Sequence, residues 1–235
     1  MHQKSTLSAN DEVIYPDSDG KPISDNTKQG DWIVLLYGNL CGLFSDRPDV
    51  FVAVSNLWYP VEGHPEIRID PDVYVAFGRP KGDRGSYKQW EENGIPLTVV
   101  FEVLSPANGY VEMEDKRLFY EDHRVEEYYV YNPDTNRLLI FIRQGQDLRR
   151  ILPEHGFVSP RLGIRFDFSA PEMRVFRSDG RRFTSFVELV AEVEDRQWQA
   201  EQARWEARQW ADEAKRSSVG QAVPDGERVE ESGTA

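Results

Sequence analysis

Short apolar runs separated by turn residues predict the strands of a central sheet. The main runs are Val50–Val54, Val73–Phe77, Val99–Leu104, Glu127–Tyr131 and Leu138–Ile142. Three further segments are expected to have extended, strand-like backbone. They are Ile67–Ile69, beside Val73–Phe77, and the pair Ile164–Phe168 and Met173–Phe176, which should form a hairpin. Between these runs, the pattern predicts a turn at Leu57–Pro60 and a long polar loop over Gly78–Pro96.

Helical spacing of apolar residues predicts helices between the strands. One helix begins near Ser24–Asn26 and ends at Ser45–Pro48, and a second covers Tyr110–His123 with Asn108 as its cap. A long C-terminal helix begins near Ser185, and its apolar and small residues form a heptad seam interrupted by Arg196. The seam comprises Phe186, Leu189, Val193, Arg196, Ala200, Ala203, Ala207, Trp210 and Ala214. This helix either folds back on the domain or forms a short coiled coil between two copies.

The order of these elements predicts an α/β fold, with a mixed central β-sheet flanked by helices and a C-terminal helical extension. The domain is expected to span residues 24–190, after a polar N-terminal arm over 1–23. A charged, alanine-rich helix over 191–216 and a disordered acidic tail over 217–235 complete the predicted organisation.

The formal net charge of −13 argues against non-specific binding to phosphate backbones through clustered Lys and Arg. A local basic cleft or a metal-mediated contact stays compatible with it. The single cysteine, Cys41, excludes an internal disulfide and a cysteine-rich zinc site. The first residues lack an apolar signal core and no apolar stretch reaches membrane-spanning length, so a cytoplasmic protein with no membrane contact is expected.

The candidate chemistry centres on Glu102, a carboxylate in the middle of a predicted buried strand. A buried carboxylate needs a cation, a hydrogen-bond donor or a raised pKa. The following turn and helix would bring Lys116 to the same place. Asp72 precedes a neighbouring strand and is the candidate second acid, but Asp49 also follows a proline and precedes a strand. Spacing alone does not choose between these two aspartates.

Three segments make the chain resemble a known family. They are PDVYVAFGRPKGDRGSYKQW (71–90), VFEVLSPANGYVEMEDKRLFY (100–120) and VEEYYVYNPD (125–134), and the shorter matches WYPVEG (58–63) and SPRLGIRF (159–166) support them. The chain is similar over roughly Asp25–Leu189 to the Uma2 family, which is also described as restriction endonucleases. The resemblance implies the restriction-endonuclease-like core of the PD-(D/E)XK nuclease superfamily, DNA as substrate, and Mg²⁺ or Mn²⁺ as cofactor.

The resemblance implies a catalytic set of Asp72, Glu102 and Lys116, in which the two acids bind the metal. The superfamily pattern would place a lysine two residues after Glu102, where this chain has Leu104. Lys116, in the family's K-x-x-x-Y pattern, is the expected substitute and would orient water or stabilise the transition state. The alternative for Lys116 is an ordinary helical pair with Glu112.

Two functions follow as hypotheses. The first is a Mg²⁺-dependent DNA endonuclease, and the second is a catalytically inactive nuclease-fold protein that acts as a binding or regulatory module. Because cutting both strands of a duplex takes two sites or one site acting twice, a homodimer that uses the C-terminal seam is expected.

Two further sets of charged residues have open alternatives. The long polar loop carries Lys81, Arg84 and Lys88, which either contact phosphates or form a solvated charged loop. In the WYPVEG segment, Glu62 either joins the acids of the site or stabilises a turn.

Overall fold

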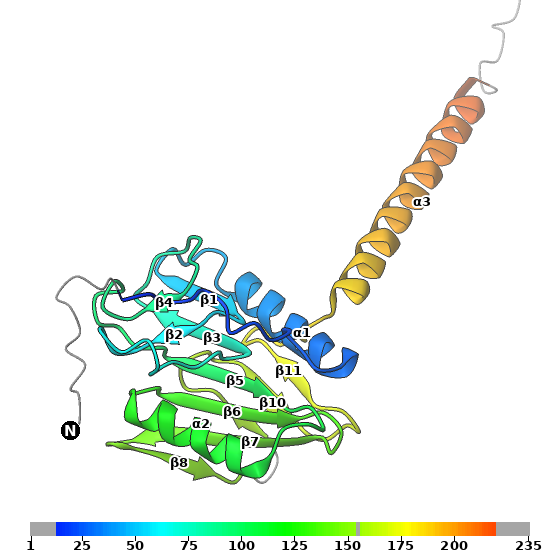
Figure 1. Cartoon of the computed structure of the whole chain (residues 1–235). Helices are drawn as coiled ribbons and strands as arrows, with labels where there is room; N and C mark the ends of the chain where they lie inside the picture. The colour runs from blue at the N-terminus through cyan, green and yellow to red at the C-terminus, as the bar shows by residue number, and fades with distance from the viewer. Residues whose placement is uncertain (1–12, 154–155, 220–235) are drawn as a thin grey trace, which may run out of the picture. The chain divides into compact units, whose positions relative to one another are not determined.

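A six-stranded sheet organises the residues up to Ser185 in the computed structural model, which describes residues 13–153 and 156–219 (Figure 1). The strand order is β1-β3-β5-β6-β7-β8, and within this sheet only β5 and β6 run parallel. The strands are β1 (Val50–Val54), β3 (Val73–Phe77), β5 (Val99–Val103), β6 (Glu127–Asn132), β7 (Arg137–Gln144) and β8 (Asp147–Ile151). The predicted mixed sheet with flanking helices is therefore confirmed.

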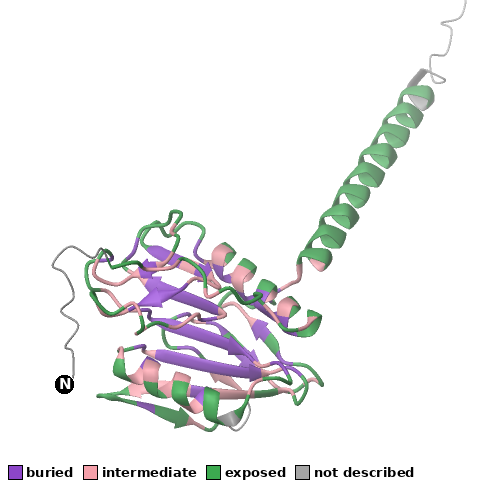
Figure 2. Ribbon diagram, viewed as in Figure 1, coloured by how far each residue is buried: buried purple, intermediate pink, exposed green. Residues whose placement is uncertain are grey.

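Two layers cover the faces of this sheet. On one face, α1 (Thr27–Leu43) packs with a small sheet of β9 (Phe157–Val158), β10 (Arg165–Asp167) and β11 (Arg174–Phe176). On the other face lie α2 (Tyr110–Asp122) and the parallel pair of β2 (Trp58–Tyr59) and β4 (Tyr87–Lys88). Every residue of β5 is buried, and Figure 2 shows burial concentrated in the central strands. Coverage of both faces explains why β5 is an almost continuous apolar run.

The N-terminal end of α1 is tied to β5, the strand that carries Glu102. The Asn26 side chain caps α1 by accepting a hydrogen bond from the Gln29 backbone N–H at 2.9 Å. The Gln29 amide then donates to the Val103 carbonyl oxygen at 2.7 Å. The predicted start of this helix is confirmed, and the cap places it directly against the end of β5.

Several local predictions are wrong. Trp58 and Tyr59 form β2 instead of a turn, and Ile69 makes only an isolated bridge to Trp58, so Ile67–Ile69 is not a strand. Asn108 does not cap α2, because its side-chain oxygen accepts from the Ser105 backbone N–H at 2.7 Å; Gly109 occupies the cap position. Strand β8 was not anticipated, since its alternation of apolar and charged residues is weak.

The Gly78–Pro96 loop is held together by a buried carboxylate. Glu92 accepts from Arg79 Nε at 2.6 Å and from Arg84 Nε at 2.5 Å, and all three side chains are only 10–13% exposed. The Arg84 guanidinium also lies over the Phe51 ring, 3.9 Å from its centroid. Arg84 therefore stabilises the fold, and it is neither a solvated charge nor a free phosphate ligand.

Replacing Glu92 with alanine should lower the free energy of unfolding by about 3–5 kcal/mol, because two buried guanidinium groups lose their shared anion. Glu91→Ala is the matched control, since the Glu91 side chain is 60% exposed and contacts only Lys88, at 3.4 Å, among the pairs described. Urea unfolding followed by circular dichroism measures both variants. Equal effects of the two substitutions would contradict the structural role of Glu92.

The second unit begins at Phe186 and contains α3 (Phe186–Val219). All nine positions of the predicted seam belong to this helix. Trp198 and Trp205, which are 61% and 59% exposed, fall outside the seam. The helix continues three residues into the predicted tail, and residues 220–235 and 1–12 lie outside the described part of the chain. The coiled coil and the homodimer stay predictions.

Across the described residues, no helix has the length and apolar character needed to cross a bilayer.

Candidate active site

Asp72 and Glu102 face each other across two neighbouring antiparallel strands. The β3–β5 register pairs Val73 with Phe101, and continuing it by one position places Asp72 opposite Glu102. Side chains opposite each other in an antiparallel pair project from the same face. That face is the one covered by α2, because Tyr74 and Val100, two residues along each strand, both belong to its apolar cluster. The two acids therefore lie on one face of the sheet, as the predicted site requires.

Two residues of α2 bind the Glu102 carboxylate. Lys116 Nζ lies 2.6 Å from Oε2, and the Tyr120 hydroxyl donates to Oε1 at 2.6 Å. The two residues are four apart, so they project from the same side of the helix. Lys116 thus pairs with Glu102, and Glu112 instead accepts from the Asn108 amide at 3.3 Å. The helical pair that was the alternative for Lys116 is not what the structure contains.

The ammonium of Lys116 is kept charged by its surroundings. Burial by itself lowers the pKa of this lysine, but the charge and hydrogen bond of Glu102 more than offset burial, and the pKa is raised. Asp72 and Glu112 add to this effect. Lys116 is therefore suited to supply a fixed positive charge, and it is unsuited to accept a proton at neutral pH.

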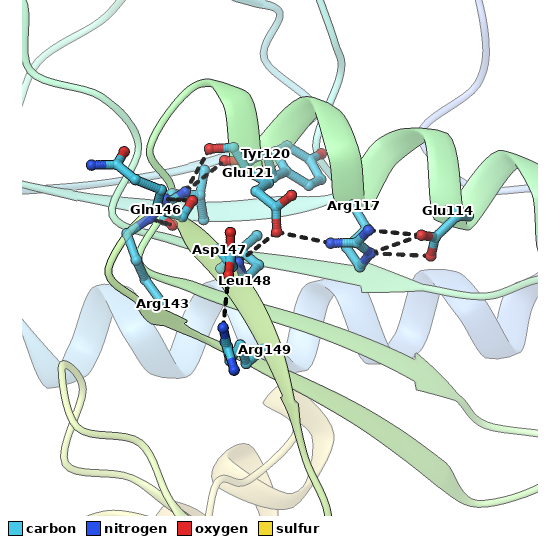
Figure 3. A network of polar contacts seen from close by, with 10 residues as sticks. Glu114, Arg117, Tyr120, Glu121, Arg143, Gln146, Asp147, Leu148 and Arg149 are labelled. Atoms are coloured by element: carbon cyan, nitrogen blue, oxygen red, sulfur yellow. Dashed lines mark hydrogen bonds and ion pairs between the residues drawn. The ribbon is translucent and has the colours of Figure 1, made fainter.

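A polar network fixes α2 on the β7–β8 hairpin, as Figure 3 shows. Arg117 of α2 binds Glu121 at 3.0 Å, and Glu121 in turn accepts from the Leu148 backbone N–H at 2.6 Å. Arg143 of β7 donates to the Glu121 carbonyl oxygen at 2.7 Å, near the C-terminal end of the helix. A cation there also favours the helix dipole. The network holds in place the two α2 residues that contact Glu102.

The carboxyl group of Asp72 is strongly perturbed. Burial raises its pKa most, the negative charge of Glu102 raises it further, and the pKa reaches about 8. The Val103 backbone N–H, which donates to Oδ2 at 2.6 Å, and the ammonium of Lys116 oppose this shift. Two acids buried side by side without a full complement of cations make this a site where added positive charge is favourable.

A polar pocket of about 270 Å³ opens beside the acid pair. Its charged lining residues are Asp19, Lys21, Asp25, Asp70, Asp72, Glu112 and Lys116. Glu102 itself does not line the pocket: its side chain is only 3% exposed and is bound by Lys116, which does line it. Glu62 is exposed and does not line the pocket. The wall thus carries more carboxylates than ammonium groups.

Sequence reasoning missed several residues of this pocket. Asp70 lines it, and its Oδ1 atom is buried with no hydrogen-bond partner in the described part of the chain, while Oδ2 accepts from Ser55 at 3.2 Å. Burial raises the pKa of Asp70, and the charges of Asp19 and Glu102 also raise it. The signal for Asp70 was its position two residues before Asp72, because alternate residues share a face. Asp19 has no comparable local signal.

The donor set suits a hard divalent cation. Among the described residues, no group of three or more His, Cys, Asp or Glu side chains is arranged to hold a metal ion. Mg²⁺ is commonly held by one or two carboxylates together with waters and substrate phosphates, so the Asp72–Glu102 pair is sufficient in number. Donor sets made of carboxylate oxygens and water suit Mg²⁺ or Mn²⁺, whereas zinc sites are usually built with Cys or His. The residues present therefore fit the cofactor that the nuclease resemblance implies.

One of three comparisons with known proteins, the comparison with family models, agrees with the motifs. No curated protein matches the chain. Among solved structures, "a putative nuclease belonging to DUF820 from Anabaena variabilis ATCC 29413" aligns with a TM-score of 0.45 and 12% identity, over 59% of this chain and 75% of the other. Residues 5–171 match the Uma2 family, described as "Putative restriction endonuclease". Because this match covers more than half of the 235 residues, the chain belongs to the Uma2 family.

Proposed function

We propose that this protein is a Mg²⁺- or Mn²⁺-dependent endonuclease that hydrolyses phosphodiester bonds in DNA. The observation that carries the proposal is the placement of Asp72 opposite Glu102, with Lys116 bound to Glu102 at 2.6 Å beside a polar pocket. Membership of the Uma2 family supports the same reaction class. The net charge of −13 does not attract DNA, and the pocket wall is itself rich in carboxylates, so binding must depend on the metal ion and on the lysines of that wall.

Asp72 and Glu102 are the proposed metal ligands. When bound there, Mg²⁺ would polarise a phosphodiester oxygen and lower the pKa of a coordinated water. Asp72 must lose its proton to act as a ligand, and its pKa of about 8 makes binding stronger as the pH rises towards that value. Tyr120 positions Glu102 by holding its second oxygen.

Lys116 is the proposed electrostatic stabiliser. Its raised pKa keeps the ammonium charged, and it lies between Glu102 and the pocket that would receive a phosphate. A preorganised positive charge aimed at the position where negative charge develops is the contribution expected of it. The same ammonium can orient an attacking water by donating a hydrogen bond.

The proposal is tested by incubating the full-length protein with plasmid and linear duplex DNA in Mg²⁺, in Mn²⁺ and in EDTA. We expect cleavage that requires either cation, together with saturable binding of the cation in calorimetry without DNA. A protein that binds neither cation and cuts no DNA under these conditions would contradict the nuclease and support the alternative, a catalytically inactive nuclease-fold protein. Cleavage that persists in EDTA would refute the metal-dependent mechanism.

A further inference from the structure

The described part of the N-terminal arm, together with the two residues that follow it (residues 13–25, called the arm below), is anchored at its start by Tyr15. The Tyr15 ring packs against Tyr59 and Trp90, with centroids 5.2 Å and 5.0 Å away. Its hydroxyl accepts from the Gly63 backbone N–H at 2.5 Å, and the Tyr59 hydroxyl donates to the Pro16 carbonyl oxygen at 2.6 Å. These contacts fix the path of the arm across residues that are far away in sequence.

A second anchor lies at the other end of the arm, next to the acid pair. The Ser105 hydroxyl donates to Asp25 Oδ2 at 2.5 Å, and Ser105 follows β5 two residues after its last member. Between the two anchors, a tight turn is held by the Lys21 backbone N–H, which donates to Asp19 Oδ1 at 2.9 Å. Residues of this turn and of the following segment form a wall of the polar pocket.

The arm brings a second lysine to a pocket dominated by carboxylates. Lys116, the other lysine of the pocket wall, is bound to Glu102. The Lys21 side chain is 80% exposed, and its ion pair with Asp19 is long, at 3.8 Å. Exposed pairs of this kind contribute little, so turning Lys21 towards an anion costs little. A polyanionic substrate entering this pocket gains a cation there that the catalytic set does not use.

We propose that the N-terminal arm is part of the substrate-binding surface and that Lys21 binds a backbone phosphate of the DNA. This inference rests on the proposed nuclease function and adds a binding residue to the same site. Lys21 contributes to substrate affinity, whereas Asp72, Glu102 and Lys116 carry the chemistry. The contact is to phosphate and reads no sequence.

Lys21→Ala in the full-length protein tests the proposal through steady-state cleavage at several salt concentrations. We expect KM to rise about tenfold with kcat nearly unchanged. The slope of log(kcat/KM) against log[salt] should become shallower by about one. Lys21→Arg should retain most of the affinity. Lys28→Ala is the matched control, because Lys28 pairs with Asp134 at 2.9 Å and does not line the pocket.

Tyr15→Ala, checked for an unchanged fold by its melting curve, should raise KM without removing a charge, since it releases the arm. If wild-type protein cuts DNA and Lys21→Ala matches Lys28→Ala in KM and salt slope, the inference fails and the nuclease function stands. A Tyr15→Ala variant that binds DNA more tightly would show that the arm obstructs the site, and would also overturn the inference. If the wild type cuts no DNA, both proposals fall together.

Discussion

Replacing Glu102 with glutamine should reduce DNA cleavage by about 10²- to 10³-fold or more while leaving the protein folded. The substitution removes a negative charge from the proposed metal site and from the partner of Lys116. Metal ions contribute several kcal/mol to transition-state stabilisation, and each 1.4 kcal/mol corresponds to about a tenfold change in rate. Single-turnover cleavage and calorimetric titration with Mg²⁺ should both show the loss.

Glutamine is chosen because its amide oxygen can still accept a hydrogen bond from Tyr120 or Lys116. Alanine would leave a buried hydroxyl and a largely buried ammonium without their acceptor, and a loss of activity could then reflect unfolding. Glu112→Gln is the matched control, since Glu112 lines the same pocket and carries the same charge. The proposed role of Glu102 as a metal ligand would be contradicted by a cleavage rate of the Glu102 variant within tenfold of wild type. An equal loss of rate in the Glu112 variant would also contradict it, because the effect would then be one of pocket charge in general.

Replacing Asp72 with asparagine should abolish cleavage and also make the metal-free protein more stable. The pKa of Asp72 is about 8 in the fold and about 3.9 in an unfolded chain. Between these values the folded state binds more protons than the unfolded state, so the free energy of unfolding falls as the pH rises from about 4 to 8. Asparagine removes that loss and still accepts from the Val103 N–H.

Urea unfolding in EDTA should therefore show a gain of a few kcal/mol for Asp72→Asn at pH 8, shrinking towards zero near pH 4. Mg²⁺ should stabilise the wild type and not the variant. Asp49→Asn is the control, because Asp49 is exposed and its pKa is lowered by the hydrogen bond from Arg47. A variant at position 72 that is less stable than wild type at pH 8 would show that the carboxylate stabilises the metal-free fold.

The choice between Asp49 and Asp72 shows where local sequence patterns stop. Both aspartates follow a proline and precede a strand. Strands β1 and β3 are antiparallel, so their beginnings lie at opposite ends of the sheet. The Asp49 carbonyl oxygen accepts from Gly78 N at 2.8 Å, at the far end of β3 from Asp72. The pairing of β3 with β5 is what brings Asp72, and not Asp49, to Glu102. The residues of a single strand do not reveal which other strand it pairs with, so this choice could not be made from local sequence.

The central strands β3, β5 and β6 were predictable because their apolar runs reflect burial on two faces, whereas β2, β4, β8 and β9 are short or weakly apolar and were not predicted. The β5 run and the lysine on the following helix suggested that Lys116 could reach Glu102, but a helical pair with Glu112 stayed open until the family resemblance favoured the contact that the structure contains. The arm was not predictable as part of the site, because Tyr15 reaches Tyr59 and Trp90 through contacts between distant segments. Asp70 was not predicted as part of the site, although its position two residues before Asp72 places both on one face of an extended segment.

The pairing of β3 with β5 also decides where this chain can change in length. Because successive side chains of a strand point to opposite faces, one residue inserted within β5 before Glu102 would turn that carboxylate towards the core under α1. An insertion near Gly82, an exposed position of the connecting loop with open space around it, leaves the alignment of the two strands unchanged. Relatives that keep the acid pair should therefore differ in the length of this connection and not in the strands that it joins.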